Sequence, residues 1–160
     1  MSDPKKEIKD AYEALKDQYS LPAFDELDRE FEISSIDHSE FILREIRRKM
    51  DDKTESFIKI LNVILQPETT ISELQECKQF SDEEKEKMFG LYKRLMLIHN
   101  TAALAGIECD DRKDAEFISS TFREWQGIKK QMITIAEKIK DAWKDDADIS
   151  DIKDEIGYLG

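Results

Sequence analysis

The sequence has few of the residues that interrupt helices, with five Gly and three Pro among 160 residues. Gly and Pro mark the frequent turns of strand-rich folds, so their scarcity favours long helices. The two cysteines, Cys77 and Cys109, lie far apart and make no disulfide framework. The longest apolar run, FIKILNVIL, is interrupted by Lys59 and Asn62. It is much shorter than the roughly 18 residues of a membrane span, so we expect no membrane partner.

Motifs of catalysis and metal binding are also missing. The two histidines, His38 and His99, and the two cysteines form no CxxC, HxxxH or Glu-x-x-His spacing. The sequence has no glycine-rich phosphate loop and no Gly-x-Ser-x-Gly. We therefore predict no catalytic residues, no metal site and no cofactor, and a protein that is not an enzyme.

Basic residues are outnumbered, at 25 Lys and Arg against 37 Asp and Glu, for a net charge of −12. The average field of such a chain repels polyanions, which disfavours a nucleic-acid partner unless basic residues gather in one patch. The N-terminus, MSDPKKEIKD, has no apolar stretch of the kind found in secretory signals. We expect a reduced, cytoplasmic protein.

Apolar residues recur at spacings of three and four, which predicts helices. The first runs from Pro4 to about Tyr19, capped by Ser2 or Asp3. A short helix is expected within LPAFDELDREFEIS, followed by an extended Glu32-Ile33-Ser34. The first long helix is expected to start at a capping box of Asp37 and Glu40, with Ile36 against Phe41, and to stop near Leu65. Its predicted seam is Leu43, Ile46, Met50, Phe57, Ile60 and Ile64, interrupted by Lys53.

Two more capping boxes follow. Thr70 and Glu73 open a short helix to about Cys77, and Ser81 and Glu84 open a long helix that ends near Gly106. Gly106 is expected to end this helix in a left-handed conformation. The long helix has the seam Met88, Leu91, Leu95, Ile98, Ala102 and Ala105. The last long helix is expected to follow Asp110 or Asp111 and to reach about Lys144, with the seam Ile118, Thr121, Trp125, Ile128, Met132, Ile135, Ile139 and Ala142.

Three seams of 3.5-residue period joined by short loops predict an all-α fold. We expect an elongated antiparallel bundle of three long helices, with an N-terminal helix and short connecting helices. The bundle domain is predicted to span 1–144. An acidic C-terminal tail, 145–160, has Ile149, Ile152 and Ile156 on one helical face, as in a short docked helix.

A cluster of basic residues occurs in LREIRRKMDD. Arg44, Arg47 and Arg48 are predicted to share one exposed arc of their helix. Acidic residues four positions away, such as Asp51 and Asp52, pair with them in one interpretation, which leaves a solvated and neutralised face. In the other interpretation the arc binds phosphate or an acidic partner. Lys93 and Arg94 extend this patch only if their helix is turned toward it.

Two acidic and apolar segments have the character of peptides that dock into a groove. One holds Phe24, Leu27 and Phe31, and the other is the tail with Ile149, Ile152 and Ile156. They either bind a partner or cover their own bundle, and we favour the second interpretation.

The runs LPAFDELDREFEI and FILREIRRKM, with LYKRLM and the closing IGYLG, resemble all-helical proteins of unknown function encoded in archaeal genomes. The resemblance covers most of the chain. It implies an archaeal, cytoplasmic protein and brings no activity or site residue with it.

These patterns favour a helical-bundle protein that acts through protein–protein contacts, as an adaptor or a subunit of a complex. The alternative is a nucleic-acid- or ribosome-associated factor that uses Arg44, Arg47, Arg48, Lys93 and Arg94. The identity of a protein partner and the choice between a monomer and a homodimer are left open by the sequence.

Overall fold

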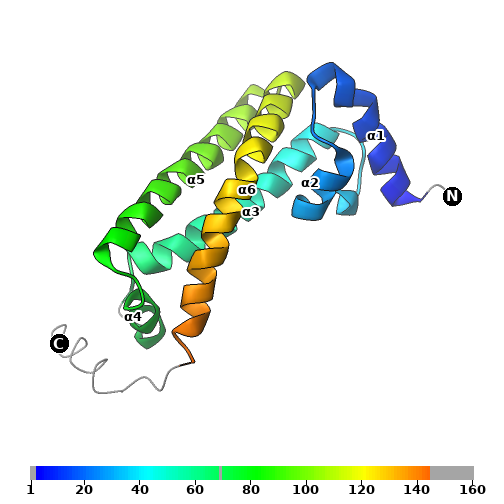
Figure 1. The fold of residues 1–160 in the computed structure, drawn as a ribbon. Helices are drawn as coiled ribbons and strands as arrows, with labels where there is room; N and C mark the ends of the chain where they lie inside the picture. Colours follow the sequence, from blue (N-terminus) through cyan, green and yellow to red (C-terminus); the bar gives the residue numbers. More distant parts are fainter. Residues whose placement is uncertain (1–2, 69, 145–160) are drawn as a thin grey trace. The chain divides into compact units, whose positions relative to one another are not determined.

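The structure is a computed structural model that describes residues 3–68 and 70–144, and these residues are helical throughout their length except at short connections (Figure 1). The elements are α1 (Pro4–Tyr19), α2 (Phe24–Phe31), the 3-10 turn η1 (Ile33–Ser35), α3 (Ile42–Leu65), α4 (Ile71–Cys77), α5 (Asp82–Glu108) and α6 (Asp111–Asp141). No strand occurs in these two ranges. The predicted all-α helical bundle is confirmed.

The chain divides into two compact units. Unit 1 comprises Met1–Ser56 and Leu95–Gln126, and unit 2 comprises Phe57–Arg94 and Gly127–Gly160. Unit 1 therefore takes the first half of α3, the last part of α5 and the first half of α6, with α1 and α2. Because successive long helices contribute opposite ends to the same unit, they run antiparallel. The tail residues Ile149, Ile152 and Ile156 lie outside the described residues.

The start of α1 follows its predicted capping signals. The Asp3 side chain accepts a hydrogen bond from the Lys5 backbone N–H, and Pro4 occupies the first turn. Ser20 ends the helix in the left-handed conformation, with φ of 53°. Ile8 and Tyr12 are buried, and the Tyr12 hydroxyl donates to the Pro22 carbonyl. These contacts hold α1 against the connection to α2.

The short helix α2 is packed into unit 1. Phe24, Leu27 and Phe31 are all buried. The Phe31 ring lies 4.7 Å from that of Trp125 on α6, measured between centroids. The Glu30 carboxylate accepts from Trp125 Nε1 at 3.2 Å. This placement agrees with the interpretation that the segment covers its own bundle.

The segment between α2 and α3 differs from its prediction. Glu32 is left-handed, with φ of 55°, and Ile33–Ser35 form a 3-10 turn instead of an extended stretch. The capping box at Asp37 and Glu40 does not start α3, which begins at Ile42. Phe41 has φ of 57° and its side chain is exposed, so it makes no hydrophobic staple. A left-handed residue at 41 cannot continue a right-handed helix backwards, and this sets the start of α3.

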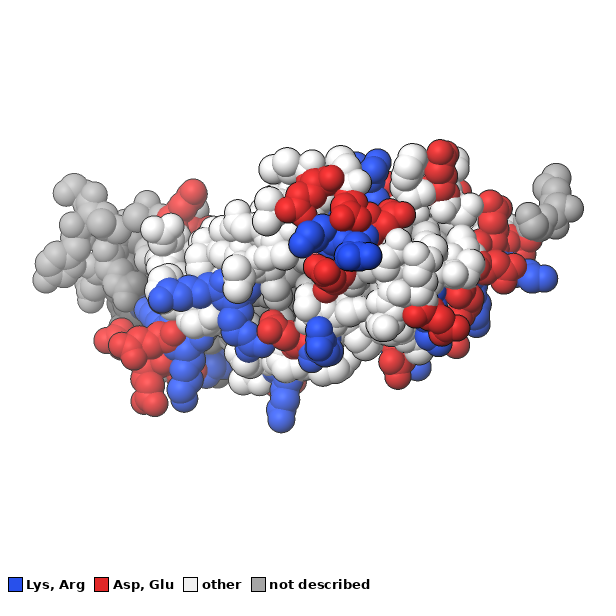
Figure 2. Space-filling view, turned by 90° about the horizontal axis from the view of Figure 1, so that it is seen from above, with Lys and Arg blue, Asp and Glu red and all other residues white. Residues whose placement is uncertain are grey.

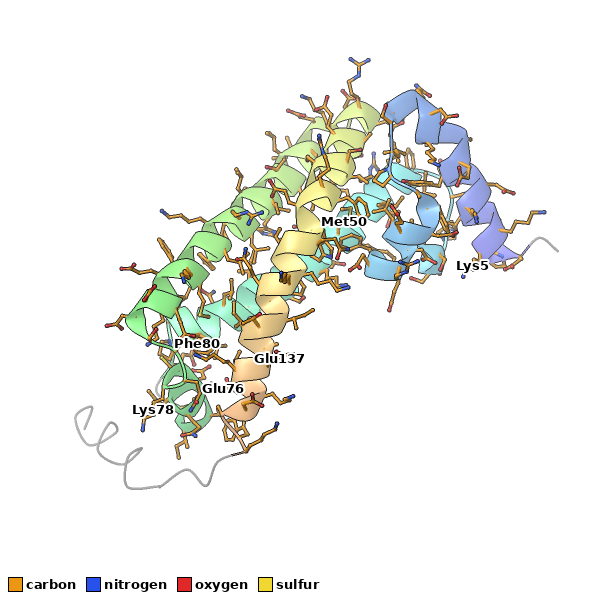
Figure 3. All side chains as sticks on the ribbon, in the orientation of Figure 1. Lys5, Met50, Glu76, Lys78, Phe80 and Glu137 are labelled. Atoms are coloured by element: carbon orange, nitrogen blue, oxygen red, sulfur yellow. The ribbon has the colours of Figure 1, made fainter. Side chains whose placement is uncertain are left out.

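The buried side of α3 shifts by one residue halfway along the helix. Leu43, Ile46, Met50 and Ile64 are buried as predicted, but between Met50 and Ile64 the buried residues are Thr54, Ile58 and Leu61. Phe57 and Ile60 are only partly buried, so the strict heptad was wrong there. The shift follows from the 3.6-residue period of a straight helix. Thr54 is accepted in the core because its hydroxyl donates to the Met50 carbonyl at 2.9 Å. Figure 3 labels Met50 on α3.

Unit 2 contains two helix starts that the sequence predicted correctly. Thr70 Oγ1 accepts from the Glu73 N–H at 3.3 Å and opens α4. Ser81 Oγ accepts from the Glu84 N–H at 3.1 Å and opens α5. Gln75 of α4 is buried and donates to the Ala142 carbonyl at 3.1 Å, which joins α4 to the end of α6. Phe80, labelled in Figure 3 on the α4–α5 connection, is also buried.

The seams predicted for α5 and α6 are confirmed. All six α5 residues are buried, and on α6 only Ile139 is partly exposed. Among the described residues, no helix is long and apolar enough to cross a bilayer.

The left-handed backbone at Phe41 has a measurable consequence. Phe41→Gly and Phe41→Ala both remove the ring, but only alanine keeps a Cβ that opposes a positive φ. We expect Phe41→Gly to be more stable than Phe41→Ala by about 1 kcal/mol in urea denaturation. Equal stabilities, or a more stable alanine variant, would contradict the left-handed conformation at this position.

Candidate functional site

The predicted arginine cluster is divided between the interior and the surface of unit 1. Arg47 is 8% exposed, whereas Arg48 is exposed and Arg44 is partly buried. The prediction that all three share one exposed arc is therefore wrong for Arg47. Arg47 lies only one position from Ile46, at the edge of the buried side of α3. A neighbouring helix with a buried carboxylate is enough to draw it inside.

Arg47 joins the three long helices within unit 1. Its Nε donates to Asp114 Oδ1 of α6 at 2.6 Å. Its Nη1 donates to the Ala102 carbonyl of α5 at 3.0 Å. Asp51, which was predicted to pair with Arg47, instead contacts His99 through Oδ1 and Nδ1 at 2.8 Å.

Gly106 makes room for the Arg47 guanidinium. A Cβ added to Gly106 would lie 3.1 Å from Arg47 Nη1 and 3.4 Å from Nη2. The predicted left-handed helix end at Gly106 is wrong, because α5 continues to Glu108 and the left-handed residue is Cys109, with φ of 52°. The glycine therefore eases the close approach of the guanidinium, which a Cβ would displace by a few tenths of an ångström, and it does not serve a left-handed backbone.

The Arg47–Asp114 pair is almost dry. Asp114 is 2% exposed, and burial raises its pKa above the usual aspartate value, while the Arg47 charge and hydrogen bond act in the opposite direction. Removal of two charges from water costs several kcal/mol per ion, and the attraction between them returns about as much. The pair therefore contributes little net stability. It mainly restricts how the three helices pack, because either charge alone in this interior is strongly unfavourable.

The other two arginines are engaged locally. Arg48 Nη1 contacts Glu45 Oε1 at 2.9 Å, and the Arg44 guanidinium lies 4.5 Å from the centre of the Phe41 ring. Figure 2 shows basic and acidic side chains interspersed over one face of the molecule. With Arg47 inside, the surface available to a phosphate is smaller than the sequence predicted.

Lys93 and Arg94 belong to unit 2, not to the unit that holds the arginine cluster. Both are exposed on α5. The Lys93 ammonium lies 4.9 Å from the centre of the Phe89 ring, and Arg94 lines a groove between α5 and α6.

Metal-ligating residues do not gather in the described parts of the chain, where no group of three or more His, Cys, Asp or Glu is placed to hold an ion. His99 lies at the edge of the core and pairs with Asp51. Burial raises the pKa of Asp51, and the hydrogen bond to His99 opposes that rise. Both cysteines are free; Cys77 is partly buried and Cys109 is exposed.

An exposed apolar stripe on α5 was missed by the sequence reasoning. Leu97, Leu104 and Ile107 are 70%, 54% and 80% exposed. At about 100° per residue they lie on the side of α5 opposite to the buried Leu95 and Ala102. Leu97, Asn100, Leu104 and Ile107 are spaced by three, four and three residues, so they form a second heptad seam. We call these four residues the outer α5 stripe.

A groove in unit 1 adjoins this stripe. Its volume is about 1070 Å³, and Leu104 is part of both the stripe and the groove wall. The groove lies among the α1–α2 connection, the end of α5 and the start of α6. Its ionisable lining residues are balanced in charge: Glu26, Glu108, Glu116, Arg112, Lys113 and Arg123. It is suited to a partner side chain more than to a small anion.

A comparison of the chain with protein-family models, with curated protein sequences and with solved structures finds no match. The resemblance to archaeal helical proteins thus stays a prediction.

Arg47 and Arg48 are adjacent and chemically identical, which makes them a matched pair for a stability test. We expect Arg47→Met to lower the free energy of unfolding by about 3 kcal/mol, because it leaves the Asp114 charge buried without its partner. Arg48→Met should change it by less than about 0.5 kcal/mol. Denaturant titration of both variants decides this.

The double variant Arg47→Met/Asp114→Leu should recover most of the loss, because the buried charge is then gone. Similar effects of Arg47→Met and Arg48→Met would contradict the internal position of Arg47.

Proposed function

We propose that this chain is a non-enzymatic helical-bundle protein that binds another protein through the outer α5 stripe. The observation that carries the proposal is that α5 is apolar on two opposite sides. Leu95, Ile98 and Ala102 face the core, while Leu97, Leu104 and Ile107 are exposed. A surface helix of a monomer normally has one apolar face. A helix with apolar residues on two opposite faces is normally covered by other elements on both faces. Exposed apolar residues gathered on one side of a helix mark interaction sites.

The spacing within the stripe points to a helix as the partner element. Residues at a 3.5-residue period pack against another helix by knobs-into-holes contacts. Asn100 is exposed in the middle of the stripe, with its Nδ2 donating to the Met96 carbonyl at 2.7 Å. A single asparagine in an apolar seam restricts register and the number of helices that associate. The proposed partner element is therefore an amphipathic helix of another protein.

The groove beside Leu104 supports the same conclusion. It provides a depression of about 1070 Å³ next to the stripe. Binding energy concentrates where a large side chain enters such a depression near the centre of an interface. A flat apolar stripe with an adjoining groove suits a helix that projects one anchor residue.

A nucleic-acid role has less support. Arg47 is engaged inside unit 1, and Arg48 is paired with Glu45. The net charge of −12 opposes association with a polyanion. Protein contacts are favoured for these reasons.

The test compares three tagged full-length chains: the natural sequence, Leu97→Glu/Leu104→Glu, and Ile133→Glu. Ile133 is 49% exposed on α6 in unit 2, so the last variant places the same charge on a different exposed apolar residue. Captured proteins from the source cells are identified after nuclease treatment at low and high salt, and the affinity of the recovered partner is then measured for each chain.

We expect the double variant to weaken binding of that partner at least about tenfold, because interface-centre positions contribute most of the binding energy. Ile133→Glu should bind as the natural chain does. Recovery that disappears with nuclease, or equal binding by the double variant, would contradict the proposal. Self-association detected by sedimentation and abolished by the double variant would make the partner a second copy of the chain.

A further inference from the structure

A second groove lies in unit 2 between α5 and α6, and its lining shares no residue with the outer α5 stripe. It has a volume of about 570 Å³. Its apolar lining consists of buried side chains from three elements: Phe80 before α5, Met88 and Leu91 on α5, and Ile135 on α6. The groove thus exposes the edge of the unit 2 core along two neighbouring helices.

Gly90 has no side chain that would project into this groove. It lies inside α5, where glycine is among the least favourable residues. A Cβ added to Gly90 would meet no atom within 4 Å, so no described neighbour requires the glycine. On the α6 side, the exposed Thr134 is also small. Small residues along facing helices allow another segment to approach the backbone closely.

The groove is basic in a strongly acidic chain. Its ionisable lining residues are Lys87, Arg94, Lys138 and Glu84, and the Lys87 ammonium lies 3.8 Å from the Glu83 carboxylate on the same helix. Glu84 contacts Lys138 across the groove, from α5 to α6, and the Lys138 hydrogen bond lowers the Glu84 pKa. Basic residues outnumber acidic ones three to one in the lining around an apolar floor, and Lys87 and Lys138 each contact a carboxylate of α5. The complementary ligand is a peptide with apolar residues on one side and acidic residues on the other.

We infer that the groove binds residues 145–160 of the same chain. This segment contains six acidic residues, at positions 145, 146, 148, 151, 154 and 155, and the regularly spaced Ile149, Ile152 and Ile156. Its charge and its apolar residues match the groove. The inference is independent of the proposed function, because it concerns another surface and another ligand.

The place of attachment favours this occupant over a separate protein. The segment follows Lys144, which is six positions after the groove residue Lys138. Sixteen residues attached this close to a site have an effective concentration of the order of millimolar, so even a weak contact is populated. A free partner at cellular concentration competes poorly with a tethered ligand of the same chemistry.

Hydrogen exchange of the full-length chain, followed by mass spectrometry, tests the inference. Backbone amides in 145–160 should exchange on the order of tenfold more slowly than the same sequence as a free peptide. Gly90→Trp fills the groove and should bring the exchange to the free-peptide rate. Gly90→Ala is the matched control, since its Cβ meets nothing, and should retain the protection. Ile152→Asp changes the segment instead of the groove, and it should abolish the protection as well.

Exchange of 145–160 at the free-peptide rate in the natural chain would overturn the inference. The inference would also be overturned if 145–160 stayed protected in Gly90→Trp while the α3, α5 and α6 amides exchanged as in the natural chain. The fold would then be intact and the contact of the segment would lie elsewhere. Protection that rises with protein concentration would show that a second copy supplies the segment, and would also reject the intramolecular contact.

Discussion

Unit 1 depends on one buried ion pair, between Arg47 and Asp114. With the Ala102 carbonyl as a further acceptor, the Arg47 guanidinium links its own helix, α3, to α5 and α6. Apolar seams allow helices to slide and rotate by small amounts at little cost, whereas a buried guanidinium with fixed donor directions does not. Gly106 is adapted to this contact, since any larger residue would crowd the guanidinium. The ion pair therefore acts on specificity of packing more than on net stability.

The long helix α5 connects packing with the proposed function. Its inner seam is a regular heptad that supplies buried residues to both units, and its outer stripe repeats the same spacing in solvent. Exposed Leu97, Leu104 and Ile107 have no role in the core of unit 1. A helix with this arrangement is typical of a chain that completes its burial in a complex, which is why we assign the partner contact to this surface.

Several basic side chains of this protein contact acidic or aromatic groups close to them. Arg48 pairs within its own helix, Lys138 pairs with Glu84 between α5 and α6, and Lys53 lies 5.5 Å from the centre of the Phe31 ring. Exposed pairs of this kind are worth little individually. Their effect is to place basic residues beside acidic ones on the described part of the chain. The groove of unit 2 has three basic residues and one acidic residue in its lining, and its Lys87 and Lys138 also take part in such pairs.

The sequence by itself determined the helices, because periodicity, capping boxes and Pro4 act over a few residues and do not depend on the rest of the fold. The starts of α4 and α5 and the seams of α5 and α6 were predicted for this reason. Only the tertiary structure decided the features that depend on neighbours from distant positions. These are the left-handed Phe41, the seam shift at Thr54, the burial of Arg47 against Asp114 and the exposure of the outer α5 stripe. A heptad pattern identifies which residues can be buried, as it did for the inner seam of α5. Whether a second pattern on the same helix is also covered depends on which helices pack against it.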